Sequence, residues 1–204
     1  GRQPPEHLRE RIATYFDPLP FWYAPLETAC IDADRYPLAA ITQRPMAMYH
    51  SWDSQNAWLR QIHAHNYLFI NVKTATSYGI ADDDWIWVES HNGKIRCQAK
   101  TMEGTQEDTV WTWNAIGKQK GAWGLKEDAS EATKGFLLNH LISELLPEKA
   151  GERRVTNSDP VTGQAAWFDL RAKIWKAAPG ETGAGPQFDA LKALPGDERY
   201  ERPD

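Results

Sequence analysis

The chain has 204 residues, of which 41% are hydrophobic and 25% charged, a balance that is ordinary for one globular domain and excludes a disordered chain. Its net charge of −5 argues against a nucleic-acid partner held through phosphates, and no apolar run is long enough to predict a membrane span. Cys30 and Cys97 are its two cysteines, too few for a four-cysteine zinc or iron–sulfur site.

The chain begins with Gly1 rather than Met, and residues 1–6 carry no charged-then-apolar leader. We therefore expect it to be a piece of a larger protein, with a catalytic centre outside it. Residues 7–16 are predicted to form a short helix, and the four prolines between residues 17 and 37 predict an extended connector that wraps a surface.

In the next part of the chain, the patterns predict short strands and helical turns. Gly79 suits a left-handed cap that ends the turn before it. The predicted elements are a strand over 38–42, a helix over 57–65, a strand over 67–72 and a helical turn over 73–78.

A β-hairpin is the clearest predicted element. Asn92-Gly93 is a strong turn signal, and it joins predicted strands over 85–90 and 94–102. Asp82, Asp83 and Asp84 precede the hairpin and predict a solvated turn rather than a metal loop, because the spaced ligands of a calcium loop are lacking.

The remaining elements lead to a β-rich core with a few helices. The longest predicted helix covers 130–146, where apolar residues share a face and Pro147 ends it. The other predictions are a strand over 109–113, a glycine-rich loop over 117–124, a polar loop over 148–163, a strand over 166–177 and a mobile tail from 178.

Motifs for self-contained catalysis are absent from the sequence. It has no G-x-S-x-G, phosphate-loop or dinucleotide fingerprint, and Arg96 is expected to point away from Cys97 on a strand. His63 and His65 suit a strand better than a zinc-binding helix face, and His91 is expected to be solvated in the hairpin turn. His50 and His140 lie in polar clusters, where a core histidine with satisfied hydrogen bonds is the alternative to a ligand.

Polar side chains on predicted loops could instead bind a large polar organic cofactor, through charge-assisted bonds to phosphate and amide bonds to a heterocycle edge. The candidates are Gln43, Arg44, His50, Ser51, Asn56, Asn139, His140, Asn157, Asp159 and Gln164.

The order of these segments resembles the C-terminal, dinucleotide-binding domain of molybdopterin oxidoreductases of the dimethyl sulfoxide reductase superfamily. The resemblance covers roughly residues 37–176. Its motif positions are Arg44, His50-Ser51, Asn56, Leu59, Asn71, Ala75, Gly79-Ile80, Asp82, Asp84, Ser90, Gly93, Asn139, Leu141, Asp159-Pro160 and Gly163.

Two positions depart from the family pattern. Asp83 stands where the family has Gly, and Asp tolerates a left-handed turn better than most residues. Ile142 replaces a Thr, which puts one hydroxyl contact in doubt. The segments around residues 111–114 and 164–168 look closest to polysulfide, thiosulfate and sulfite-oxidising members.

The resemblance implies a mainly β fold with peripheral helices, a six-stranded double-psi β-barrel. It divides the chain into a proline-rich connector over 1–36, the barrel domain over 37–177 and a tail over 178–204. In such enzymes this domain caps two molybdopterin guanine dinucleotides with Mo or W.

Carried over, the resemblance places nine residues at the cofactor. Gln43 and Arg44 would approach pterin or pyrophosphate, and His50 and Ser51 would bond pterin or phosphate. Asn139, Asp159 and Gln164 would hold pterin or guanine edges, with Asn56 and His140 nearby.

The metal ligand and any iron–sulfur cysteines would lie in parts of the protein outside this chain. The expected partners are the rest of the catalytic subunit, a membrane anchor protein and an iron–sulfur electron-transfer subunit. The substrate class would be a small sulfur oxyanion, and the cytoplasm is favoured over the periplasm.

Two other readings stay open at this point. The ten tryptophans would also suit a stand-alone β-barrel module that stacks on carbohydrate or peptide. A different double-psi barrel enzyme would need a carboxylate pair or a processed nucleophile, and none is evident.

Overall fold

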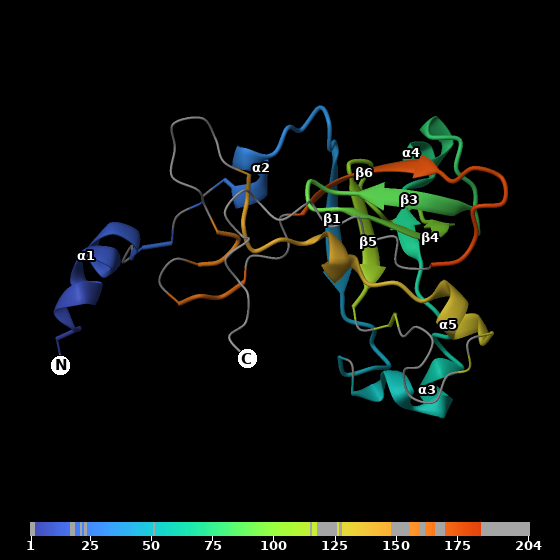
Figure 1. The fold of residues 1–204 in the computed structure, drawn as a ribbon, viewed down its shortest axis with the longest axis horizontal. Helices are drawn as coiled ribbons and strands as arrows, with labels where there is room; N and C mark the ends of the chain where they lie inside the picture. The colour runs from blue at the N-terminus through green and yellow to red at the C-terminus, as the bar shows by residue number, and fades with distance from the viewer. Residues whose placement is uncertain are drawn as a thin grey trace, which may run out of the picture.

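The computed structural model describes residues 3–16, 19–20, 22, 24–50, 52–114, 116–117, 126, 128–147, 156–159, 162–165 and 170–184. Six strands in these ranges close into a barrel in the order β1-β5-β2-β4-β3-β6 (Figure 1). The strands are β1 (Leu38–Gln43), β2 (Leu68–Ile70), β3 (Trp85–Glu89), β4 (Lys94–Thr101), β5 (Thr109–Trp113) and β6 (Arg171–Lys176).

The barrel is mixed. β1 pairs with β5 and β2 with β4 in parallel, while the other four neighbouring pairs are antiparallel. This arrangement confirms the six-stranded double-psi barrel that the sequence predicted.

Alternate residues of each strand fill the barrel interior, as a period of two requires. Ile86 and Val88 are fully buried there, and they alternate with Trp85 and Trp87 as predicted. The interior also holds Leu38, Ala40, Leu68, Ile70, Ile95, Cys97, Ala99, Val110, Ala172 and Ile174. Burial in this apolar interior raises the pKa of the Cys97 thiol far above its ordinary value.

Short helices lie around the barrel. Figure 1 shows α4 at one end of the barrel, α3 and α5 toward the other, and α1 away from it. α1 has no buried residue. The helices are α1 (Glu6–Tyr15), α2 (Leu26–Cys30), η1 (Asp53–Gln55), α3 (Ala57–Arg60), α4 (Val72–Ser77), α5 (Ser130–Lys134) and η3 (Leu138–Leu141).

The long helix predicted over 130–146 is wrong, because α5 and η3 are separate short pieces. Leu137 is extended between them, with φ −128° and ψ 128°. The Ser90 hydroxyl donates to the Leu141 carbonyl at 2.6 Å, and the Asn92 amide donates to the His140 carbonyl at 3.3 Å. The β3–β4 hairpin therefore donates hydrogen bonds to carbonyls that would accept from backbone N–H groups in a helix. These tertiary contacts override the helical pattern of the sequence.

Two other predicted elements are also corrected. The helix predicted over 57–65 ends at Arg60, where residues 61–62 form a turn and 64–65 a bend. Within the predicted extended connector, α2 forms a short helix, and its Glu27 carboxylate is fully buried. Glu27 accepts the Arg171 backbone N–H at 2.8 Å, so the connector is fastened to the start of β6.

The first residues of the predicted mobile tail, 178–184, pack against the outside of the barrel. Glu181 accepts a hydrogen bond from the Trp87 indole at 3.1 Å, and the Arg96 guanidinium donates to the Gly183 carbonyl at 2.7 Å. Ala184 donates its backbone N–H to Thr133 in α5. Residues 185–204, like 118–125 of the predicted glycine-rich loop and 166–169 of the predicted last strand, lie outside the described residues.

Candidate functional site

The parallel strands β1 and β5 end side by side, and this end of the barrel carries most of the candidate residues. Gln43 is in register with Trp113, and the Gln43 carbonyl accepts the Asn114 backbone N–H at 2.7 Å. Asn66, just before β2, links β2 to the same end of the barrel, because its side-chain amide donates to the Trp113 carbonyl at 2.8 Å. Figure 1 shows β1 and β5 pointing the same way, toward the side where α3 and α5 lie.

Arg44 and His50 contact each other directly after β1. Arg44 Nη2 lies 2.9 Å from His50 Nε2, and a guanidinium can only donate. The His50 Nε2 atom must therefore accept, which places the ring proton on Nδ1. His50 has a φ of 48°, a left-handed conformation that costs a non-glycine residue free energy and that turns the loop back toward Arg44.

The loop around His50 is held by two local hydrogen bonds. The Asp53 carboxylate accepts the Tyr49 backbone N–H at 2.8 Å, and the Asn56 side chain caps α3 by accepting the Trp58 N–H at 3.0 Å. Asn56 thus has a structural role in addition to the predicted one. Ser51 lies outside the described residues.

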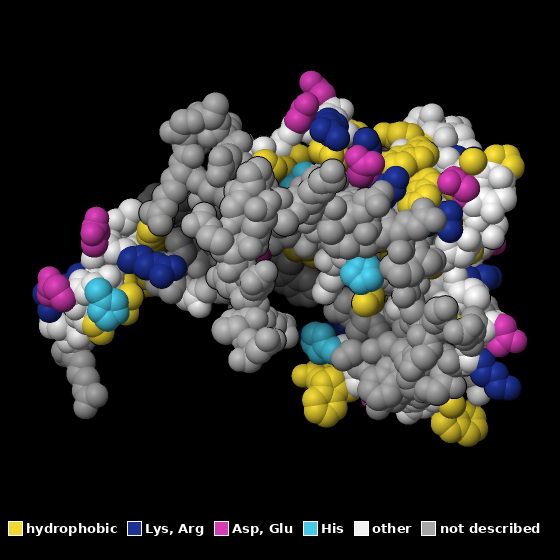
Figure 2. Space-filling view, in the orientation of Figure 1, with side chains coloured by type: hydrophobic (Ala, Val, Ile, Leu, Met, Phe, Trp, Pro, Cys, Tyr) yellow, Lys and Arg dark blue, Asp and Glu magenta, His cyan; other side chains and the backbone are white. Residues whose placement is uncertain are grey.

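Large apolar side chains project from this same loop. Figure 2 shows hydrophobic groups at the lower edge of the molecule, where Figure 1 places α3. The most exposed side chains of the loop and α3 are Met46, Tyr49, Trp52, Trp58 and Ile62.

Asn139 and His140 lie on η3, which packs against β4 beneath the hairpin. The register of β4 with β2, and of β2 with β5, places the first half of β4 toward the end where β5 terminates. Asn139 is exposed and His140 half-buried. The fold thus brings these two residues to the end of the barrel that carries Gln43 and Arg44.

Asp159 and Gln164 form a separate turn. The Asp159 carboxylate accepts the Thr162 backbone N–H at 2.6 Å, and the Asp159 N–H donates to the Gln164 carbonyl at 2.7 Å. Both side chains are exposed. Nearby, the Asn157 amide donates to the buried Glu27 at 3.3 Å, so Asn157 serves as an anchor, and Figure 1 shows this segment beside α2, apart from α3.

Two threonines that the sequence analysis missed lie at the end of β1 and β5. Thr42 and Thr112 are neighbours in register, and Thr112 is fully buried. The Oγ1 atoms of both, and Oδ1 of Asn114, are buried and have no hydrogen-bond partner among the residues that the structure describes. Each is the second-last residue of its strand and points into the barrel. This shared position in β1 and β5 is the signal that could have identified them.

A buried hydroxyl or amide oxygen without a hydrogen-bond partner lowers the stability of the fold. An apolar ligand at this end would leave them unpaired, whereas a pterin nucleotide carries both donors and acceptors. Together with the exposed Arg44 guanidinium, this donor set fits such a cofactor.

The remaining histidines do not gather into a metal site. His63 and His65 pack their rings against Trp113 and Tyr67, with centroid distances of 5.5 and 4.5 Å, and burial lowers the pKa of His63. In the described part of the chain, no three His, Cys, Asp or Glu residues form a group that could hold a metal ion. The prediction of a solvated His91 is wrong, because the ring is half-buried and burial lowers its pKa, against a raising contribution from the Leu145 backbone.

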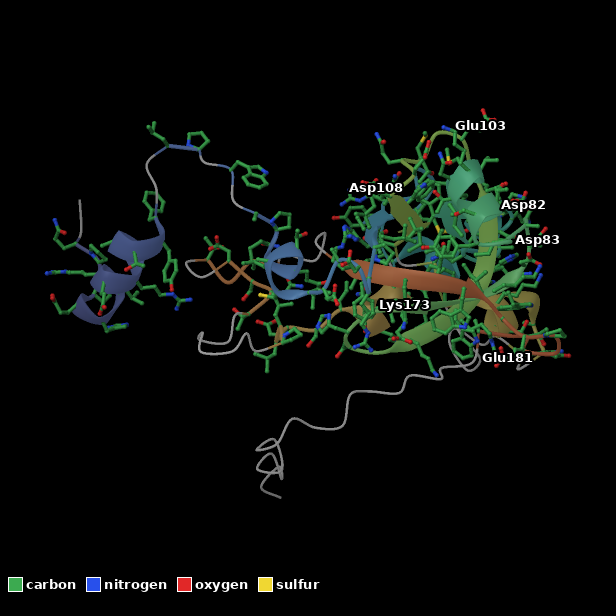
Figure 3. All side chains as sticks on the ribbon, turned by 90° about the horizontal axis from the view of Figure 1, so that it is seen from above. Asp82, Asp83, Glu103, Asp108, Lys173 and Glu181 are labelled. Carbon is green, nitrogen blue, oxygen red and sulfur yellow. The ribbon has the colours of Figure 1, made fainter. Side chains whose placement is uncertain are left out.

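The three aspartates form the solvated turn that was predicted. Figure 3 shows Asp82 and Asp83 projecting outward at the surface. Hydrogen bonds from Lys100 and Thr101 lower the pKa of Asp82 to about 2. Asp83, where the family has Gly, has a φ of 65°, so it adopts the left-handed conformation that a glycine would supply.

Comparisons with known proteins show the family to which the chain belongs. The family described as "Molydopterin dinucleotide binding domain" matches residues 38–162. A sulfite dehydrogenase subunit of Allochromatium vinosum is 62% identical over 200 residues, which cover 98% of this chain and 21% of that protein. Dopamine dehydroxylase of Eggerthella lenta is 31% identical over 179 residues, which cover 86% of this chain and 15% of that protein.

The acetylene hydratase structure from Pelobacter acetylenicus has the same fold, with a TM-score of 0.57 and 24% identity over 81% of this chain and 22% of that one. The chain therefore spans about a fifth of the length of such relatives. The stand-alone carbohydrate or peptide module is not favoured, since the chain matches a family described by its binding of a molybdopterin dinucleotide. No helix in the described ranges is long and apolar enough to cross a membrane.

Proposed function

Because the chain belongs to the molybdopterin dinucleotide-binding domain family, we propose that its barrel holds molybdopterin guanine dinucleotide at the end where β1 and β5 terminate. The observation that carries this proposal is the Arg44–His50 pair, 2.9 Å apart, directly after β1. The pair follows the strand that carries Thr42, whose hydroxyl, like that of Thr112 in register with it, is buried and has no partner among the described residues.

Each group of the pair has a defined task. The Arg44 guanidinium offers planar, paired donors to a pyrophosphate or a pterin carbonyl. His50, with Nε2 engaged by Arg44, directs its Nδ1–H toward the cofactor as a second donor. Ser51 would add a hydroxyl to the same loop.

The amide side chains would read the heterocycle. Gln43 lies at the end of β1 and Asn139 on η3, and both are exposed. Asn56 uses its carbonyl oxygen as a helix cap, so only its NH₂ group would face the cofactor. Thr42 and Thr112 would gain the partners that they lack.

The turn that carries Asp159 and Gln164 lies apart from Arg44, beside α2. Two separated groups of polar side chains suit a long dinucleotide, or two copies of it, better than one compact ligand. We assign Asp159 and Gln164 to a guanine edge, with His140 beside the first group.

The chain's own contribution is positioning and charge. When bound, the cofactor's Mo or W would supply two-electron redox chemistry. Relatives that carry this domain include a dopamine dehydroxylase and a sulfite dehydrogenase subunit, so we infer that substrate choice lies largely outside it. On the strength of the 62% identity, we propose a small sulfur oxyanion as substrate. The partners we propose are a membrane anchor protein and an iron–sulfur electron-transfer subunit.

Replacing Arg44 by Ala in the full catalytic subunit tests the proposal. Loss of a charge-assisted bond costs on the order of 1.5–3 kcal/mol, so metal and pterin content per molecule should fall several-fold at limiting cofactor supply. Elemental analysis and pterin fluorescence measure the two contents.

Arg9→Ala is the matched control, because Arg9 is an exposed arginine on α1, and it should retain full content. Full metal and pterin in Arg44→Ala would contradict the assignment. Equal loss in both variants would point to general instability instead.

A further inference from the structure

A fully buried carboxylate, that of Glu27, joins three parts of the chain that are far apart in sequence. Its Oε2 atom accepts the Arg171 backbone N–H at 2.8 Å, and its Oε1 atom accepts the Asn157 side-chain amide at 3.3 Å. Glu27 lies on α2, Arg171 begins β6, and Asn157 leads into the turn that carries Asp159 and Gln164. Figures 1 and 3 show α2 beside this turn, so the carboxylate fastens the turn to the rest of the domain.

Both oxygens of Glu27 are needed as acceptors. A carboxylate accepts at each oxygen, whereas a glutamine of the same shape has one acceptor and one NH₂ donor. The Asn157 amide turns its NH₂ group toward Glu27, although its own Oδ1 atom is then buried with no hydrogen-bond partner among the described residues. A buried carboxylate costs free energy unless it is hydrogen-bonded, so Glu27 holds the Asn157 amide and the Arg171 N–H in fixed positions.

The turn follows its anchor closely. Ser158 alone separates Asn157 from Asp159, and Ser158 forms an antiparallel bridge with Ala165 across the turn. The Asp159 N–H also donates to the Gln164 carbonyl at 2.7 Å. Because these contacts brace the turn from both sides, a shift of Asn157 would displace the side chains of Asp159 and Gln164 together.

The second partner of Glu27 belongs to the frame of the barrel. The Arg171 guanidinium donates to the Pro37 carbonyl at 2.7 Å and to the Tyr36 carbonyl at 3.1 Å. Its backbone pairs with Ala39 of β1. Since β1 ends at the other group of candidate residues, Glu27 ties the turn to the strand that positions that group.

We propose that Glu27 is a positioning residue for the nucleotide end of the cofactor, because it sets the place of the Asp159–Gln164 turn relative to β1. This inference rests on the proposed function, in which the turn takes the guanine edge. Without the carboxylate, the domain should continue to bind phosphate through Arg44 but should lose its preference for guanine.

Amide hydrogen exchange in the cofactor-free full subunit, read by mass spectrometry, tests the positioning. In Glu27→Ala, the peptide over residues 156–165 should exchange about tenfold faster, the change in a local opening equilibrium expected from one lost bond to a buried charge. The β4 peptide, residues 94–101, should exchange as in the parent. Unchanged exchange over 156–165 overturns the proposal, and equal acceleration in β4 assigns Glu27 to the fold as a whole and also overturns it.

Glu103→Ala is the matched control, because Glu103 is an exposed glutamate in a turn after β4. It should leave both peptides unchanged. A rise over 156–165 in this control as large as in Glu27→Ala would show that the turn responds to any lost carboxylate, which contradicts the proposal.

A swapped pair separates the hydrogen-bonding pattern from the shape. Asn157→Asp sets two carboxylates against each other in a buried position, so the turn should exchange faster than in the parent. Combining Asn157→Asp with Glu27→Gln exchanges the amide and the carboxylate, and the new amide can donate to position 157 while it accepts the Arg171 N–H. Slow exchange should return in the double variant, and exchange as fast as in Asn157→Asp alone overturns the proposal.

The functional readout is the choice between two diphosphates that differ in their base. Titration calorimetry on the cofactor-free full subunit compares guanosine diphosphate with adenosine diphosphate. The parent should prefer the guanine form, and Glu27→Ala should lose about tenfold in affinity for it, as expected for a displaced hydrogen-bonding group, with adenosine diphosphate unchanged. The swapped double variant should recover the preference, whereas Arg44→Ala should weaken both ligands alike.

Two failures can be told apart in this comparison. A Glu27→Ala variant that keeps the parent's preference for guanine overturns the role of Glu27 and leaves the proposed function standing. A parent that does not distinguish the two diphosphates contradicts the guanine assignment of the turn, and the role of Glu27 falls with it.

Discussion

At the end of the barrel near α4, the chain pairs the side chain of Asn71 with its own backbone and leaves Gln98 Oε1 without a partner among the described residues, whereas more oxygens lack such a partner at the end where β1 and β5 finish. Asn71 caps α4 through the Lys73 N–H at 2.8 Å and donates to the Thr105 carbonyl at 2.6 Å. At the other end, the Thr42 and Thr112 hydroxyls have no partner among the described residues, and the side chains of Trp52 and Trp58 are exposed. Within the described residues, the end where β1 and β5 finish therefore carries more unpaired buried oxygens than the end near α4.

This difference has an energetic meaning. Buried hydrogen bonds such as those of Asn71 contribute about 1 kcal/mol each to folding, while an unpaired buried oxygen costs about as much or more. The open end therefore lowers the stability of the domain and keeps free energy available for binding, as functional sites commonly do.

Glycines at the two ends should respond very differently to a methyl group. At Gly117, a Cβ would clash with the Phe136 carbonyl oxygen, whereas Gly79 has open space but a φ of +64°. Gly117→Ala must displace the backbone before η3, and we expect it to lower the free energy of unfolding by about 3 kcal/mol. Gly79→Ala should cost about 1 kcal/mol, from the left-handed backbone alone.

Urea unfolding of the two variants gives both values, and cofactor content of the corresponding full-length proteins gives a second comparison. Gly117→Ala should lose cofactor because η3 carries Asn139, and Gly79→Ala should keep it. Equal stability losses would remove the distinction between the two ends.

Two asparagine caps provide a finer contrast. Asn71→Ala removes a helix cap and leaves the buried Thr105 carbonyl unpaired, so unfolding should become easier by about 2 kcal/mol, with cofactor content unchanged. Asn56→Ala removes a cap on an exposed loop and should cost about 0.5 kcal/mol or somewhat more, while lowering cofactor content. A reversed order of stabilities in urea would show that the α4 end is not the self-sufficient one.

The smallest expected effect is the acid response of the turn near α4. Asp82 has a pKa of about 2, below its ordinary 3.8, so its contribution is present above about pH 4 and is lost as the pH falls through about 2. Because the side chain is 42% exposed, solvent screening reduces this contribution to about 1 kcal/mol.

Asp82→Asn should therefore be less stable than the parent at neutral pH, and the gap should close as the pH is lowered toward about 2. Thermal unfolding across that range measures it. A gap that stays constant with pH would mean that Asp82 acts through its hydrogen-bonding shape rather than its charge.

The residue patterns predicted the strands well and a β-rich core, while the closed barrel came from the family resemblance. Ile86 and Val88 against Trp85 and Trp87, and the Asn92-Gly93 turn, specify β3 and β4 locally. The left-handed Asp83 was also foreseen, since the constraint is confined to one residue. The helix over 130–146 failed because Ser90 and Asn92, about fifty residues earlier in the chain, take its carbonyls.

In the candidate site too, the residue types could be predicted from the sequence, whereas their arrangement in space could not. Arg44, His50 and Asn139 could be chosen from the chain by their chemistry and their order. Their grouping, the tautomer that Arg44 imposes on His50, and the separation of Asp159 all depend on strand register. Thr42 and Thr112 escaped notice because a threonine in a strand looks like ordinary β-structure until its neighbour across the sheet is known.

The reactivity of the Cys97 thiol can report how often the barrel opens transiently. It lies at the centre of the closed sheet, fully buried, while Cys30 is partly exposed. A thiol reagent should label Cys30 promptly and reach Cys97 only when the strands separate. The ratio of the two labelling rates therefore measures the opening equilibrium of the barrel within one molecule, and a cofactor or neighbouring segment that closes the open end should slow the second rate without touching the first.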